Sequence, residues 1–154
     1  EYCVIDSPNQ ISPVMEYAIF PADLFIVPFE STKAVKSYAN VYALVLRVRG
    51  EAPPTLHVLS NLSRLEGQRR RVVALMDQEG IERVASEIRS CGWLAQADEH
   101  GGAIFHYRPH ANGAKDMEAL KEEVLAAIGV RTRASRSRTL ETMHQTVTGM
   151  PIPL

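Results

Sequence analysis

Three short runs of apolar residues, rich in branched side chains, predict β-strands in this chain. They are Tyr2–Ile5, Leu24–Val27 and Leu56–Leu59, and Val84–Ile88 is a weaker fourth candidate. The first three runs are hydrophobic throughout instead of alternating, which is typical of strands that are covered on both faces. We therefore expect a sheet that lies inside a layered domain.

Segments with helical periodicity separate these strands. Ser12 followed by Pro13 predicts a helix start, because serine caps helices and proline suits the first turn. Gly50 follows a long periodic segment and predicts its end. The strands and helices alternate, which predicts a largely parallel sheet with right-handed crossovers. The expected helices span residues 13–20, 32–49, 65–78 and 116–128.

Polar or turn residues follow three of the predicted strands. Asp6, Pro28 and Asn61 each lie just beyond a strand end. Ligands of parallel sheets bind at the carboxyl ends of the strands, so this edge is the expected position of a site.

The composition is typical of a single globular domain. The chain has 154 residues, 45% of them hydrophobic, and a net charge of −1, which fits one domain with a core and no overall preference for nucleic acid. Cys3 and Cys91 show neither pairing nor zinc-like spacing, as expected in a reducing cytoplasm. A start on a strand without Met predicts a fragment or a processed product. Residues 131–154, with four arginines and few apolar residues, predict a basic flexible tail.

Four segments occur in an order that points to one family. They are Cys3–Pro8 (CVIDSP), Ala22–Pro28 (ADLFIVP), Leu56–Asn61 (LHVLSN) and Gly102–Ala114 (GAIFHYRPHANGA). Over about residues 1–128 the chain resembles the carboxyl-terminal half of the ParA/MinD family, the deviant Walker-motif ATPases that partition plasmids and chromosomes. The last segment is the most specific, because several unusual positions recur together.

The resemblance implies a fold and a set of site residues. The fold is a three-layer α/β sandwich with a largely parallel sheet of the P-loop NTPase type, with the N-terminal part missing; residues 1–130 are its C-terminal half. Asp6 would be catalytic and would hold Mg²⁺ through water, and Asn61 and Arg89 would lie beside the adenine of ATP. Four arginines would contact DNA phosphates: Arg64, Arg69, Arg70 and Arg71.

The implied activity belongs to the intact protein. It would bind Mg-ATP, form a nucleotide-sandwich homodimer, coat nucleoid DNA non-specifically in the cytoplasm, and be released by a ParB-like partner. The Gly-rich, Lys-containing phosphate loop is absent, so we do not expect this chain alone to hydrolyse ATP. A membrane-binding tail is disfavoured, because residues 132–146 offer only Leu140 and Met143 as large apolar residues.

Each assignment has a structural alternative. Asp6 could be a helix cap or a structural aspartate, Asn61 could cap the next helix, and Arg89 could be a solvated surface residue. The arginines could form an ordinary solvated helix face, and His100, His106 and His110 are expected to be surface residues. Two other functions remain open: a non-catalytic DNA- or partner-binding module of this family, and a cell-division or cellulose-secretion branch of it.

Overall fold

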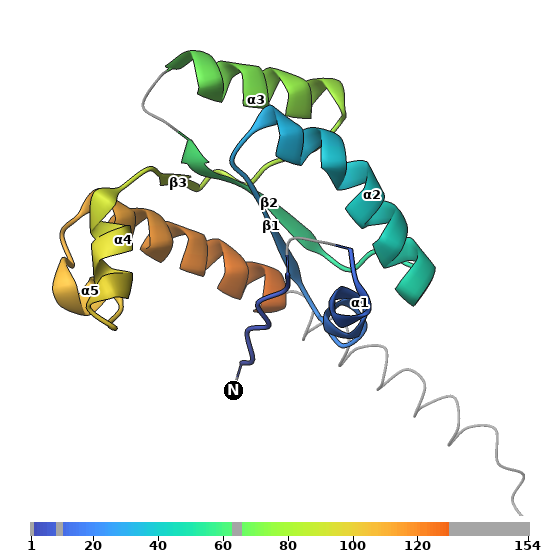
Figure 1. Ribbon diagram of the computed structural model, residues 1–154, viewed down its shortest axis with the longest axis horizontal. Coiled ribbons are helices and arrows are strands. Elements are labelled where there is room, and N and C mark those ends of the chain that lie inside the picture. Colours follow the sequence, from blue (N-terminus) through green and yellow to red (C-terminus); the bar gives the residue numbers. More distant parts are fainter. Residues whose placement is uncertain (1, 9–10, 63–65, 130–154) are drawn as a thin grey trace, which may run out of the picture.

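The fold comes from a computed structural model that describes residues 2–8, 11–62 and 66–129 (Figure 1). The predicted tail at 131–154 and the predicted DNA contact Arg64 lie outside these residues. The described part is a mixed α/β structure, as the alternation of strands and helices predicts.

Three parallel strands form the sheet, in the order β1-β2-β3. The strands are β1 Phe25–Phe29, β2 Thr55–Leu62 and β3 Glu87–Arg89. Val27 lies opposite His57, and Leu59 lies opposite Glu87. All three strands therefore end at the same edge of the sheet.

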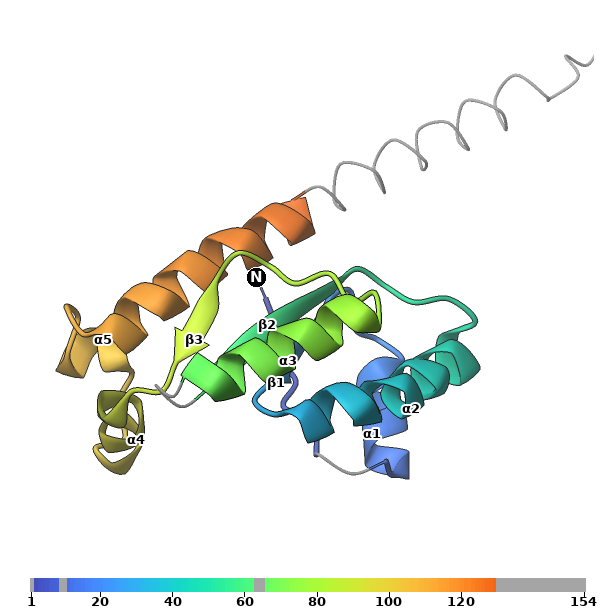
Figure 2. The same ribbon diagram turned by 90° about the horizontal axis from the view of Figure 1, so that it is seen from above.

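Helices alternate with the strands and cover both faces of the sheet. Figure 2 shows α2 and α3 on one side and a helix over residues 112–129 on the other. The labelled helices are α1 Pro13–Ile19, α2 Thr32–Arg49, α3 Glu66–Gln78, α4 Gly92–Glu99 and α5 Ile104–Tyr107.

The bounds of α2 follow from its end residues. The Ser31 hydroxyl accepts a hydrogen bond from the Ala34 N–H at 3.2 Å, which caps the first turn. Gly50 ends the helix in the left-handed region, with φ 78°, and donates its N–H to the Leu46 carbonyl at 2.8 Å. The predicted helix and its predicted stop are both confirmed.

The main core lies between the sheet and the α2–α3 layer. Phe29 and Leu59 from the strands pack with Val72 and Met76 of α3, and all four are almost completely buried. Val58, which precedes Leu59 in β2, is also buried. Neighbouring strand residues point to opposite faces, so Val58 faces the side of the sheet that the 112–129 helix covers. Helices on both faces explain why β2 is hydrophobic without alternation.

The strand predicted at Tyr2–Ile5 is wrong. Residues 2–8 have no regular secondary structure, and Val4 is 92% exposed. A strand persists only where its backbone groups pair with a neighbour, and none of the three strands pairs with this segment. Asp6 is therefore exposed and does not follow a strand. The weaker prediction at Val84–Ile88 is displaced, because β3 covers only Glu87–Arg89.

Candidate functional site at the carboxyl ends of β2 and β3

A hollow of about 780 Å³ lies where β2 and β3 end. Its wall begins with Leu59 and Leu62 of β2 and continues through Ile88 and Arg89 of β3. Arg69 of α3, Glu87 of β3, residues 90–93 at the start of α4 and residues 110–112 complete it. This volume falls within the range of about 300–1,000 Å³ that is typical of small-molecule sites. The predicted location of the site, at the carboxyl edge of the sheet, coincides with this hollow.

Asn61 lies between two residues that line the hollow. It adopts φ 49°, which is uncommon for a residue other than glycine and most accessible to asparagine and aspartate. The pairing of β2 with β3 shifts register between Ser60 and Leu62, so Asn61 is the extra residue of a bulge. Such bulges re-aim side chains next to sites, and Asn61 is exposed. Residues 63–65, which would test the helix-capping alternative, lie outside the described part of the chain.

Arg89 lines the hollow and is held by Asp116 of the 112–129 helix. The Arg89 guanidinium donates from Nε to Oδ2 at 3.0 Å and from a terminal nitrogen to Oδ1 at 2.6 Å, and its backbone N–H donates to Oδ2 at 3.1 Å. Burial raises the pKa of Asp116, but the hydrogen bonds from Arg89 outweigh it and lower the pKa overall. Arg89 is thus a bound arginine, and its contact with adenine stays a prediction.

The arginines predicted to contact DNA differ in their surroundings. Arg69 donates from Nε to Glu87 at 2.9 Å, with a second bond from a terminal nitrogen, and it lines the hollow. Arg70 and Arg71 are exposed on α3. Because consecutive helix residues point in different directions, the Arg69 side chain faces the sheet while the next two face outward.

The sequence did not single out the aromatic wall of the hollow. Trp93 lines it, and the Arg108 guanidinium lies over the indole ring, 4.5 Å from its centroid. Tyr107 packs against His100, with ring centroids 4.6 Å apart and the ring planes inclined by 41°. The arginine comes from the turn after α5, fifteen residues beyond Trp93, so only the packing of α4 on α5 brings the two together. The positions of Trp93 and Arg108 in the sequence therefore do not predict that the two side chains are in contact.

The carboxylates at the hollow do not fit a magnesium site. Glu87 and Asp116 are both engaged by arginines, and Asp6 is not among the residues that line the hollow. No group of three potential ligands among His, Cys, Asp and Glu occurs within the described residues. Among the described residues, the hollow therefore offers Mg²⁺ no carboxylate that is free of an arginine partner.

Comparisons with known proteins leave the family open. No protein-family model matches this chain. A search of curated proteins gives no significant match either. The described helices also include none that is both long and apolar enough to cross a bilayer. Function is therefore inferred from the geometry of the hollow and from the resemblance noted in the sequence.

Proposed function

We propose that this chain belongs to a ParA-type partition ATPase, a P-loop NTPase-like protein, and that the hollow at the ends of β2 and β3 takes the adenine base of ATP. One observation carries the proposal: the hollow lies at the carboxyl ends of adjacent parallel strands, where nucleotides bind in α/β sheets. The exposed amide of Asn61, beside two lining residues, offers both a donor and an acceptor to a purine edge.

The roles of the remaining groups follow from their positions. Trp93 offers an aromatic surface on which a base can stack. Arg89 is held in place by Asp116, which fixes the wall formed by β3. The phosphates and Mg²⁺ would be held by groups other than the carboxylates of Glu87 and Asp116. Asp6, as the residue that orients the metal and takes part in catalysis, remains part of the proposal for the intact protein. A ParB-like partner, homodimer formation and attachment to the nucleoid belong to the same proposal.

Binding of adenine nucleotides can be followed through Trp93, the one tryptophan of the sequence. We expect ATP and ADP to change its emission with saturation, and GTP to do so more weakly. Asn61→Ala should weaken ATP binding about tenfold, as expected for a lost hydrogen bond of about 1.4 kcal/mol. Asn40→Ala, an exposed asparagine on α2, is the matched control and should leave affinity unchanged. Absence of any saturable response to ATP and ADP would contradict the proposed site.

DNA binding is expected to depend on the two outward arginines of α3. Changing Arg70 and Arg71 together to alanine should weaken binding to a random duplex and reduce the slope of log K against log salt by roughly 2. Arg69→Ala should change the slope little, because Glu87 holds that side chain. Lys121→Ala, on the helix across the sheet, serves as the control. An unchanged slope in the Arg70 and Arg71 variant would remove these residues from the DNA surface.

A non-catalytic binding module of the same family is the second candidate. The exposed position of Asp6, outside the sheet and away from the hollow, favours it. The two proposals share the nucleotide- and DNA-binding surfaces and differ in Mg²⁺-dependent ATP turnover, which the module lacks.

A further inference from the structure

The guanidinium of Arg108 lies against two aromatic rings and has no carboxylate partner among the described residues. Its central carbon is 4.5 Å from the centroid of Trp93 and 5.5 Å from that of Tyr107. Separations below about 6 Å are those of cation–π contacts. The ion pairs of the described part of the chain do not include Arg108. It therefore differs from Arg69 and Arg89, which carboxylates hold.

The guanidinium covers the side of the indole that is turned away from the hollow. Trp93 lines the hollow, whereas Arg108 does not. A guanidinium on the ring face that looks into the hollow would itself line the hollow. The surface of the indole toward the hollow is therefore open, which agrees with an exposed fraction of 40% for Trp93.

The backbone that carries the guanidinium is fixed on both sides. The Arg108 N–H donates to the Ile104 carbonyl at 2.7 Å, and the Arg108 carbonyl accepts from the Ala111 N–H at 3.0 Å. Pro109 comes next in the chain, and its ring restricts its own backbone and that of the residue before it. Arg108 is thus held in the turn after α5, and Figures 1 and 2 show α5 beside α4, which carries Trp93.

Gly113 allows close packing of the helices that carry this pair. It lies near the start of the 112–129 helix, where a Cβ atom would come 2.9 Å from Cγ of Leu94 and 3.1 Å from Cδ1 of Ile104. Leu94 belongs to α4 and Ile104 to α5, so only glycine lets the third helix approach both this closely. The indole and the guanidinium therefore extend from one closely packed frame.

The indole needs such a contact to keep one orientation. Trp93 lies in the first turn of α4, and an exposed side chain exchanges between staggered rotamers. Its other aromatic neighbour, Tyr107, is more distant, with ring centroids 6.3 Å apart and ring planes inclined by 59°. A base that stacks on the indole must select one rotamer, which costs side-chain entropy. A guanidinium that already lies on one side of the ring removes part of this cost.

We propose that Arg108 is a positioning residue of the nucleotide site: its guanidinium holds the Trp93 indole in the orientation in which a purine base stacks on the side toward the hollow. This inference rests on the proposed binding of adenine in the hollow. In the complex, the indole is the middle layer between the guanidinium and the base. Arg108 itself touches neither the base nor the phosphates, because it does not line the hollow.

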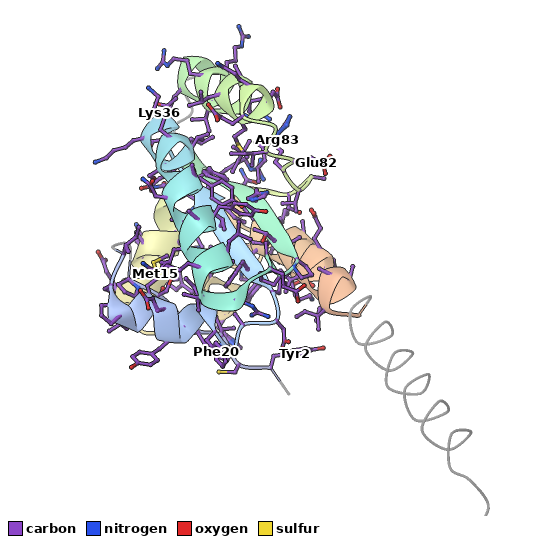
Figure 3. All side chains as sticks on the ribbon, turned by 90° about the vertical axis from the view of Figure 1, so that its right-hand side faces the viewer. Tyr2, Met15, Phe20, Lys36, Glu82 and Arg83 are labelled. Carbon is purple, nitrogen blue, oxygen red and sulfur yellow. The ribbon has the colours of Figure 1, made fainter. Side chains whose placement is uncertain are left out.

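Titration calorimetry with adenosine, which has no phosphates, separates this role from a simple attraction between Arg108 and an anion. We expect Arg108→Ala to weaken the binding of adenosine and of ATP by the same factor, about fivefold, as for the loss of one exposed cation–π contact. Arg108→Lys should restore most of the affinity, because an ammonium group also binds an aromatic ring. Arg83→Ala is the matched control and should leave affinity unchanged. Arg83 lies in the loop between α3 and β3 (Figure 3), pairs with Asp77 and does not line the hollow.

The rotational freedom of Trp93, the one tryptophan of the sequence, gives a second measurement that needs no ligand. In time-resolved anisotropy, Arg108→Ala should increase the amplitude of the fast depolarisation of Trp93 emission. Arg108→Lys and Arg83→Ala should leave this amplitude close to that of the wild type. Far-UV circular dichroism reports whether each variant is folded.

Three results would overturn the role of Arg108 while leaving the nucleotide site in place. They are an adenosine affinity that Arg108→Ala does not change, a loss of affinity that is confined to ATP, and a Trp93 depolarisation that is the same in the wild type and in Arg108→Ala. A wild-type chain that does not bind adenosine would instead refute the base site itself, and this inference with it.

Discussion

Replacing Phe29 by alanine is expected to lower the free energy of unfolding by about 4 kcal/mol. Phe29 is only 1% exposed and lies at the centre of the main core. Its ring meets Tyr38 edge-on, with centroids 5.6 Å apart, and contacts β2 through His57 at 5.8 Å. Alanine would leave a cavity between β1, β2 and α2 that the neighbouring backbone cannot close, so both lost transfer energy and the cavity contribute.

Urea unfolding followed by Trp93 emission measures this loss. Trp93 lies on α4, away from Phe29, so the probe reports global unfolding instead of a change at the site of substitution. Phe105→Ala removes the same ring from an exposed position and should cost about 1 kcal/mol or less. Similar losses in the two variants would mean that Phe29 is not the centre of the core.

Elements with local signals were predicted well from the sequence. The α2 helix has an apolar stripe, a serine cap and a glycine stop, and all three are encoded within the element itself. Two buried strands, β1 and β2, were also located, although β2 runs three residues further than predicted and includes Asn61. The extension of β2 matters because it contains the bulge at Asn61, which lies next to the hollow. No pattern of residues in the sequence predicts this bulge.

The errors share a non-local cause. Tyr2–Ile5 has the same apolar character as β1, yet it forms no strand, because strand formation depends on a paired neighbour that composition does not supply. The short helices α4 and α5 were missed because they, too, depend on contacts with distant parts of the chain. Ile104 and Ala97 are buried against each other, so these helices depend on mutual packing more than on any repeat in their sequences.

The sequence placed two candidate residues at the edge of the sheet where the hollow lies, but it did not predict what these residues contact. Parallel strands place their carboxyl ends together, so Asn61 and Arg89 could be assigned to one edge of the sheet from the order of elements alone. The ion pairs of Arg69 and Arg89 could not be predicted, since their partners, Glu87 and Asp116, lie 18 and 27 residues away. These pairs give both arginines a structural partner, while the predicted DNA contact of Arg69 and the predicted adenine contact of Arg89 stay predictions.

Replacing Asp116 is expected to have the second largest effect, and the effect should depend on pH. Asp116 is 8% exposed and accepts hydrogen bonds from both the guanidinium and the backbone N–H of Arg89. Asp116→Asn keeps the shape of the side chain but loses the charge, and it should lower the free energy of unfolding at pH 7 by about 2 kcal/mol, as expected for hydrogen bonds to a charged group.

The direction of the pH dependence follows from the lowered pKa of Asp116. A carboxyl group with a lower pKa in the folded state stabilises the fold above its unfolded pKa of about 3.9. This stabilisation is lost as the pH falls through the folded value. The difference between wild type and Asp116→Asn in urea unfolding should therefore be full at pH 7 and shrink from about pH 5 downward. Asp77→Asn, on an exposed carboxylate 3.6 Å from Arg83, should show little difference at any pH. If the difference for Asp116→Asn stayed constant down to pH 2, its charge would not be what holds Arg89 at the wall of the hollow.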